Sequence, residues 1–132
     1  MTPVFLDTVG LIALWDKSDQ WHQAASAAFG KLPAGSLVTT TTFVLLECGN
    51  AGTRKPYRSS VDDIRIQLTQ KGLLVIPSDD DWNQAWQDYR TGHANTGGIV
   101  DQVSFVVMRR LGITDAFTND QHFQSAGFTT LF

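Results

Sequence analysis

Val4-Phe5-Leu6-Asp7-Thr8 stands near the N-terminus of the 132-residue chain and predicts its central β-strand. The run is apolar, ends in a carboxylate and is followed at once by a helix-forming segment over 9–14. Buried parallel strands are continuous apolar runs rather than alternating ones. Ligands bind beyond the carboxyl ends of the strands in such sheets. We therefore expect Asp7 at the functional edge of a parallel sheet, with Thr8 capping the helix that follows.

Short apolar runs and helical segments alternate along the rest of the chain. Further strands are expected at 36–40, 73–76, 116–118 and 128–131, and helices at 20–29, 43–51, 61–70, from 78 onward, and 101–111. Such alternation, with brief connections, predicts a parallel sheet covered by helices on both faces. A chain of this length supports one sizeable core, so we expect a single domain over residues 1–132.

The composition excludes several classes of protein. The formal net charge of −3 argues against sequence-independent adhesion to nucleic acid over a broad basic face, so any contact must be local. No apolar stretch approaches the length of a membrane span and no signal leader is visible, which predicts a soluble cytoplasmic protein without a membrane partner. The single cysteine, Cys48, excludes a disulfide framework and is expected to be a small buried hydrophobe.

Glu47 is the only glutamate among thirteen acidic residues. A helix surface selected for solubility and helix propensity normally uses Glu freely, so this one invites a specific explanation. Its neighbours Leu45, Leu46 and Cys48 are apolar, a context in which an ionised carboxylate is costly unless paired or bound to a cation. A partly exposed Glu at a helix border explains the position equally well. Asn50 is expected on the same helix face.

Three aspartates, Asp7, Asp101 and Asp120, stand at similar boundaries between expected strands and helices. Each alone is explained as a helix cap or first-turn residue. Right-handed crossovers bring such boundaries to one edge of the sheet, where Glu47 would join them. Asp115 is expected at the opposite end of its strand, outside this cluster.

A cluster of four carboxylates needs protons or a cation. Two carboxylates about 4 Å apart repel by roughly 4 kcal/mol at an effective dielectric constant of 20. Oxygen ligands without Cys or His select Mg²⁺ or Mn²⁺. These metals suit phosphodiester hydrolysis because they activate water and stabilise the departing oxygen.

Four segments of the chain resemble the signature segments of PIN-domain ribonucleases, and most closely those of VapC-type toxins from toxin–antitoxin pairs. They read Phe-Leu-Asp7-Thr-Val-Gly-Leu-Ile-Ala-Leu, Thr-Thr-Phe-Val-Leu-Leu-Glu47-Cys-Gly-Asn50, Val-Asp101-Gln-Val-Ser104-Phe-Val-Val-Met and Thr118-Asn-Asp120-Gln-His-Phe123. The resemblance implies a three-layer α/β/α fold with a mostly parallel sheet of about five strands. It also implies Mg²⁺- or Mn²⁺-dependent endoribonuclease activity, a homodimer and inhibition by a cognate antitoxin.

The same resemblance assigns roles to individual residues. Asp7, Glu47, Asp101 and Asp120 match the acidic catalytic and metal-ligand positions, with Glu47 holding a metal or the attacking water. Supporting polar residues are expected at Thr8, Asn50, Ser104, Thr118 and Asn119. Among them, Thr118 is expected to bond a ligand carboxylate or a metal-bound water.

Contacts to RNA or an antitoxin are expected from the few clustered basic residues, Arg54, Lys55, Arg58, Arg109 and Arg110. The loop over 91–98, which includes His93, is long enough to shape a site rim. An aromatic stripe at helical spacing is expected to be core, with a homodimer contact as the alternative for part of it: Trp82, Ala85, Trp86 and Tyr89.

Two other functions compete with the nuclease interpretation. A haloacid-dehalogenase-like phosphohydrolase also begins with an apolar strand ending in Asp, but it needs a second Asp where this chain has Val9. A non-catalytic binding module, whose carboxylates only cap helices and which acts through protein or RNA contacts, stays open as the alternative.

Overall fold

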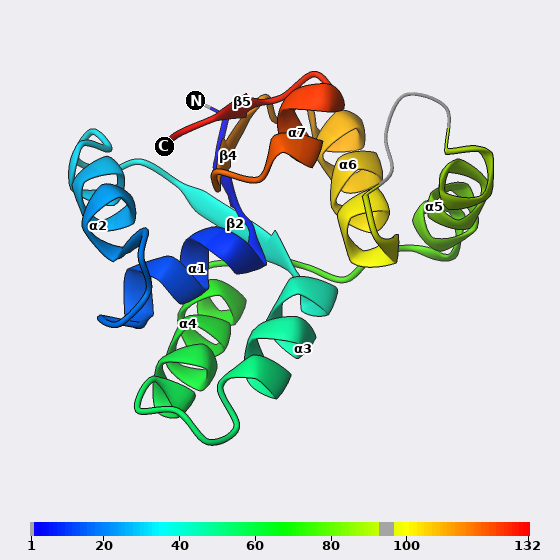
Figure 1. Ribbon diagram of the computed structural model, residues 1–132. Helices are drawn as coiled ribbons and strands as arrows, with labels where there is room; N and C mark the ends of the chain where they lie inside the picture. Colours follow the sequence, from blue (N-terminus) through cyan, green and yellow to red (C-terminus); the bar gives the residue numbers. More distant parts are fainter. Residues whose placement is uncertain (1, 93–96) are drawn as a thin grey trace.

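The computed structural model describes residues 2–92 and 97–132 (Figure 1). The described residues form seven helices and five strands. In chain order they are β1 (Val4–Leu6), α1 (Thr8–Trp15), α2 (His22–Gly30), β2 (Val38–Thr41), α3 (Thr42–Ala51), α4 (Arg58–Gln70), β3 (Leu74–Val75), α5 (Asp79–Thr91), α6 (Ile99–Leu111), β4 (Asp115–Phe117), α7 (Gln121–Ser125) and β5 (Thr129–Thr130).

All five strands pair in parallel, in the order β3-β2-β1-β4-β5. Helices cover both faces of the sheet, and Figure 1 shows α2 and α5 at opposite ends of the molecule. The predicted three-layer α/β/α fold with a parallel sheet of about five strands is confirmed. Among the described residues, none of the helices has the length and apolar content to cross a bilayer.

Strand β1 is central because all three of its residues are apolar and buried. Phe5 lies opposite Thr39 of β2 on one side and Ala116 of β4 on the other. This register brings the carboxyl ends of β1, β2 and β4 to the same edge of the sheet. The residues that follow β1 and β4 are therefore neighbours there, although the two strands are far apart in sequence.

Helix α1 packs very closely against β4. A methyl group added at Gly10 would lie 2.0 Å from the carbonyl oxygen of Phe117, so only glycine fits this position. Beneath this contact lie fully buried aromatic rings, including Phe5, Phe105 and Phe123. The ring centroids of Phe105 and Phe123 are 4.9 Å apart. This packing fixes α1, α6 and α7 around the end of β1.

Two helix starts follow the expected capping chemistry. Thr41 accepts a hydrogen bond from the backbone N–H of Val44 at the start of α3. At the start of α5, Ser78 and Asp81 form a reciprocal capping box. Helix α6 begins at Ile99 rather than at the predicted residue 101, which places Asp101 in its first turn.

The prediction that Thr8 caps α1 is wrong. Asp7 occupies the N-cap position, its side chain makes no capping hydrogen bond, and Thr8 is the first helical residue. The reason is competition: the Asp7 carboxylate accepts from Thr118, while the Thr8 hydroxyl donates to Glu47.

The prediction that the aromatic stripe of α5 belongs to the core is also wrong for three of its four residues. Ala85 is buried, but Trp82, Trp86 and Tyr89 are 42%, 41% and 51% exposed. Helix α5 packs on α6 through the face that carries Ala85, together with the pair between Asp81 and Arg110. The exposed rings contact one another edge to face along α5.

Candidate active site

The site is organised around Asp7, which directly follows β1 and is 1% exposed. Thr118, which follows β4, donates its hydroxyl hydrogen to Asp7 Oδ2 over 2.9 Å. The backbone N–H of Asp7 also donates to the carbonyl oxygen of Phe117 at 3.4 Å. The parallel pairing of β1 with β4 therefore holds this carboxylate in a fixed place.

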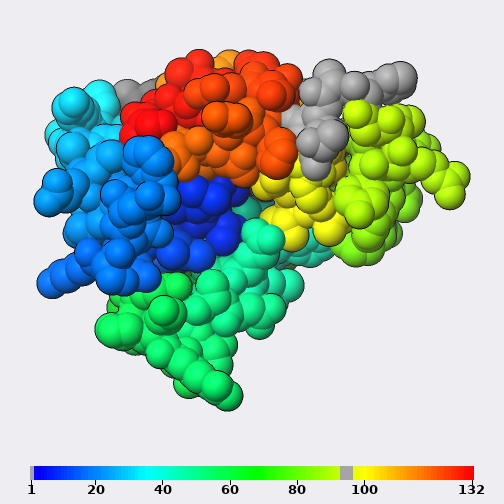
Figure 2. All heavy atoms as spheres, in the orientation of Figure 1, coloured from blue at the N-terminus to red at the C-terminus, as the bar shows by residue number. Residues whose placement is uncertain are grey.

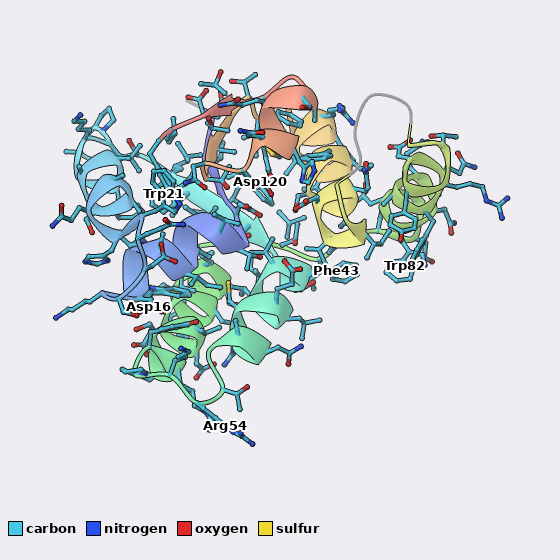
Figure 3. The ribbon with its side chains drawn as sticks, viewed as in Figure 1. Asp16, Trp21, Phe43, Arg54, Trp82 and Asp120 are labelled. Carbon is cyan, nitrogen blue, oxygen red and sulfur yellow. The ribbon has the colours of Figure 1, made fainter. Side chains whose placement is uncertain are left out.

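Asp120 is connected to Asp7 through the same threonine. The Thr118 hydroxyl oxygen accepts from the backbone N–H of Asp120 at 3.1 Å. In turn, Asp120 Oδ1 accepts from the backbone N–H of His122 at 2.9 Å and caps α7. Figure 3 shows Asp120 on the α7 side of the site. Asp120 is the one member of the predicted set whose carboxylate acts as a helix cap.

Asp101 reaches the same place from the first turn of α6. Its Oδ2 lies 3.7 Å from Nδ1 of His122, and that nitrogen lies 3.2 Å from Asp120 Oδ1. Asp101, Asp120 and His122 each offer one ligand atom, and these atoms all lie within 4.8 Å of one another. Three residues, from α6 and from the start of α7, therefore meet closely enough to share a metal ion.

Glu47 approaches from α3 and is exposed, in agreement with the helix-border interpretation of its position. Its Oε1 accepts a short hydrogen bond of 2.6 Å from the Thr8 hydroxyl, which orients it toward the end of β1. Figure 2 shows α1, α3, α6 and α7 meeting around a hollow on the displayed face.

The neighbouring Cys48 is buried, and burial raises the pKa of its thiol to about 12, so it is an inert packing residue.

The carboxylates act on one another electrostatically. Burial, and to a smaller extent the charges of Asp101 and Asp120, together raise the pKa of Asp7 to about 7 against the opposing effect of the Thr118 hydrogen bond. Burial likewise raises the pKa of Asp101 to about 6, with contributions from Asp120 and Glu47. All four predicted acidic residues therefore belong to one electrostatic cluster.

The donor chemistry of this cluster fits a divalent cation. Within residues 2–92 and 97–132, no Lys or Arg side chain forms an ion pair with Asp7, Glu47, Asp101 or Asp120. The cluster thus concentrates negative charge, and among the described residues His122 is the one basic side chain within ion-pair distance of it. Carboxylate oxygens are the ligands that hard divalent ions take.

The supporting polar residues divide into two groups. Thr8 and Thr118 hydrogen-bond the acidic cluster directly. Ser104 instead donates to the carbonyl oxygen of Val100 within its own helix, at 3.0 Å. Asn50 is exposed, and Asn119 is half-buried just after β4.

A groove of about 390 Å³ opens beside Glu47 and Asn50, with the exposed rings of Trp82 and Trp86 in its lining. Figure 3 shows Phe43 of α3 beside Trp82 across this groove.

Asp115 is exposed at the opposite end of β4 from the cluster, as the strand length predicts. Of the predicted rim loop over 91–98, residues 93–96, including His93, lie outside the described residues.

The basic residues are not equivalent. Arg110 forms a bidentate ion pair with Asp81, with Nε donating to Oδ1 at 2.9 Å and Nη2 donating to Oδ2 at 2.7 Å. This pair joins α6 to α5. Arg109 donates to the carbonyl oxygen of Ala126 and lies over the Phe128 ring. Both guanidinium groups therefore have intramolecular partners.

Arg54, Lys55 and Arg58 are exposed at the turn between α3 and α4. Arg58 donates to the carbonyl oxygen of Thr53. Figure 3 places Arg54 at the tip of this helix pair, away from Asp120. These three residues are free to meet a partner only outside the acidic site.

Sequence reasoning missed His122 as a member of the site. The signal was available, because His122 stands two residues after an aspartate already expected in the cluster, at the start of a short helix. The sequence alone does not show that the start of α7 lies beside the first turn of α6, which brings His122 Nδ1 to 3.7 Å from Asp101 Oδ2.

Comparison with known proteins places the chain in a family. A search of protein-family models gave no match. The chain is 30% identical over 126 residues, 95% of each sequence, to the curated "23S rRNA-specific endonuclease VapC20" of Mycobacterium tuberculosis. The crystal structure of Mycobacterium tuberculosis VapC20, described as a "Sarcin-Ricin loop cleaving toxin", matches with a TM-score of 0.82 at 27% identity over 96% of both chains.

Two more distant structures share the fold alone. FitAB bound to an IR36 DNA fragment matches with a TM-score of 0.71 over 96% of this chain and 92% of that one. FitAcB from Neisseria gonorrhoeae matches with a TM-score of 0.66 over 98% and 96%, and both are 13% identical to this chain. The relationship to VapC20 over nearly the whole length confirms the resemblance seen in the sequence: the chain belongs to the VapC-type family of PIN-domain ribonuclease toxins.

Proposed function

We propose that this protein is a divalent-metal-dependent endoribonuclease that cleaves ribosomal RNA as the toxin of a toxin–antitoxin pair. The observation that carries the proposal is an acidic cluster with no neutralising Lys or Arg in the described chain. Asp101 and Asp120 lie close together, and both Asp7 and Glu47 are electrostatically coupled to Asp101. Ribosomal RNA is proposed as the substrate because the relative VapC20 is named for 23S rRNA and for the sarcin-ricin loop.

We infer that Asp7, Glu47, Asp101 and Asp120 hold Mg²⁺ or Mn²⁺. When bound, such an ion acidifies water and stabilises the negative charge that develops on a phosphate during cleavage. Asp7 is the fixed member because it is buried and held by Thr118. Glu47 is the exposed member, and the Thr8 hydroxyl orients it at the mouth of the site, where it can accept a hydrogen bond from the attacking water.

The protein contributes binding and orientation in the remaining steps. RNA would bind over the hollow between α1, α3, α6 and α7 (Figure 2), because the exposed Glu47 and the half-buried Asp101 and Asp120 are carried by the elements around it. Thr8 and Thr118 keep two carboxylates from turning away when the substrate phosphate arrives. No side chain of the cluster needs to form a covalent bond to phosphorus.

Partners are proposed on the same basis. A cognate antitoxin would inhibit the enzyme by covering the acidic hollow, and Arg54, Lys55 and Arg58 are available to bind it or RNA. We propose a homodimer whose contact includes the exposed rings of Trp82, Trp86 and Tyr89, since such rings are favoured in interfaces. The proposed site of action is the cytoplasm, where ribosomal RNA is found.

Cleavage of ribosomal RNA by purified protein tests the proposal. We expect a discrete cut with Mg²⁺ or Mn²⁺, none with EDTA, and a loss of at least about a hundredfold in rate for Asp101→Asn. Asp115→Asn is the matched control, because Asp115 is an exposed aspartate outside the cluster, and it should keep full activity. Equal cleavage by the parent and Asp101→Asn, or no cleavage under any metal condition, would favour the non-catalytic binding module instead.

A further inference from the structure

We propose that His122 is a metal ligand of this site, and that its imidazole gives the protein a preference for Mn²⁺ over Mg²⁺. The inference rests on the proposed function, since it concerns the same cation site. The sequence predicts an oxygen-only ligand set, whereas the structure brings a ring nitrogen among the carboxylates. The consequence is a different metal preference from that of a purely acidic site.

The position of the His122 ring follows from the start of α7. Asp120 Oδ1 accepts from the backbone N–H of His122 at 2.9 Å, which holds the backbone of His122 beside the Asp120 carboxylate. Nδ1 then lies 3.2 Å from Asp120 Oδ1 and 3.7 Å from Asp101 Oδ2. The nitrogen that faces the carboxylates is therefore the atom available to an ion between them.

These separations match those between neighbouring ligands of one octahedral ion. With metal–ligand bonds of about 2.1 Å, two ligands at a right angle lie about 3.0 Å apart. The Nδ1–Asp120 distance is already close to this value, and the Nδ1–Asp101 distance needs only a small rotation of either side chain. No ligand atom in the group of three lies more than 4.8 Å from another.

The ligand types favour Mn²⁺ over Mg²⁺. Mg²⁺ takes oxygen ligands and retains several waters, whereas affinity for nitrogen ligands rises along the first-row transition metals, beginning with Mn²⁺. One imidazole with two carboxylates therefore discriminates between the two ions without closing the site to solvent. Asp7 and Glu47 complete the acidic surroundings, since the charges of Asp101 and Asp120 act on Asp7 and that of Glu47 acts on Asp101.

The competing interpretation is an ion pair in which His122 only balances the charge of Asp101 and Asp120. Pulsed electron paramagnetic resonance of the Mn²⁺-loaded protein separates the two, because a directly coordinated imidazole nitrogen gives a ¹⁴N coupling to the Mn²⁺ electron spin. The variant is His122→Gln, which keeps the backbone N–H that donates to the Asp120 cap of α7. The matched control is His22→Gln, since His22 lies on α2 and its Nδ1 contacts the carbonyl oxygen of Ala13.

We expect the ¹⁴N coupling in the parent and in His22→Gln, and its loss in His122→Gln. Calorimetric titration should also show Mn²⁺ affinity falling by at least about tenfold in His122→Gln, with Mg²⁺ affinity changing less than about threefold. Two results would overturn the inference about His122 while leaving the proposed metal site intact. One is Mn²⁺ bound at the acidic site without a ¹⁴N coupling, and the other is an unchanged Mn²⁺ to Mg²⁺ affinity ratio in His122→Gln. Mn²⁺ binding that is insensitive to Asp7→Asn would instead overturn the proposed metal site.

Discussion

Thr118 and Asp7 are hydrogen-bonded across 111 positions of sequence, with the threonine hydroxyl donating to Asp7 Oδ2 at 2.9 Å. The bond joins the carboxyl ends of the neighbouring strands β1 and β4. Because it stabilises the ionised form, it works against the burial that raises the pKa of Asp7. Thr118 therefore keeps the most buried carboxylate of the site available to a cation.

Thr118→Val tests this relationship. Removing the donor should weaken Mn²⁺ binding by about ten- to a hundredfold, the usual range for groups that orient metal ligands. Thr40→Val is the matched control, because Thr40 is equally buried but donates to the carbonyl oxygen of Leu6. The control should lose about 1 kcal/mol of stability and keep its metal affinity. Equal loss of affinity in both variants would show that Thr118 acts only through general packing.

The stability of the metal-free protein should fall as pH rises from about 4 to about 7. Asp7 has a folded-state pKa of about 7, so over this range the folded chain retains a proton that the unfolded chain has released. Each such proton contributes a slope of up to about 1.4 kcal/mol per pH unit. Below pH 4 the full stability is present, and above pH 7 the loss is complete.

Denaturant unfolding in EDTA at pH 5 and pH 8 measures this effect. The parent should be less stable at pH 8, and Asp7→Asn should reduce the difference because it removes the titrating group. Mn²⁺ affinity should follow the opposite trend and increase with pH over the same range, since bound metal displaces the proton. A parent protein that gains stability from pH 5 to pH 8 without metal would contradict the assignment.

The ion pair between Asp81 and Arg110 should stabilise the packing of α5 on α6. Asp81 is buried, and the Arg110 guanidinium holds the pKa of its carboxyl below the usual range. Asp81→Asn should lower the free energy of unfolding by about 1 to 3 kcal/mol at pH 7. Asp80→Asn, an exposed neighbour in the same helical turn, should have little effect. Chemical denaturation of both variants makes the comparison, and equal stabilities would refute it.

Gly10→Ala should destabilise the protein strongly. The added methyl group would lie 2.0 Å from the Phe117 carbonyl oxygen, so α1 must move away from β4, at a cost of about 1 to 3 kcal/mol or more. Gly49→Ala provides the control, since nothing lies within 4 Å of its added methyl group on α3. That substitution should be neutral or stabilising by up to about 1 kcal/mol. Thermal unfolding distinguishes the two, and similar melting temperatures would contradict the packing described for α1.

Much of the fold follows from local sequence patterns. The apolar run over 4–6 predicts the central strand correctly, because a strand with neighbours on both sides and helices on both faces has no polar side. The places of Asp7 and Asp120 at strand ends follow from the same pattern. Asp101 is reached only through the topology, since its own position in the first turn of α6 resembles that of any helix-start aspartate.

The errors arise where tertiary contacts decide between local alternatives. Thr8 has the chemistry of a cap, but Glu47 of α3 takes its hydroxyl. The rings of Trp82 and Trp86 have helical spacing, which identifies one face of α5 without revealing that this face is exposed. His122 approaches the carboxylates only because the start of α7 lies beside α6, where its Nδ1 is 3.2 Å from Asp120 Oδ1 and 3.7 Å from Asp101 Oδ2. None of these choices is encoded within a short window of sequence.

The most direct test of the acidic metal site is thermal unfolding of the parent and Asp7→Asn during titration with Mn²⁺. Without metal, Asp7→Asn should melt at a higher temperature than the parent, because a buried charge and its repulsion are removed. With Mn²⁺, the parent should gain stability in proportion to the logarithm of the ion concentration, and Asp7→Asn should gain little. A parent protein whose melting temperature does not change with Mn²⁺ would contradict the proposed metal site. So would an Asp7→Asn variant that Mn²⁺ stabilises as much as it stabilises the parent.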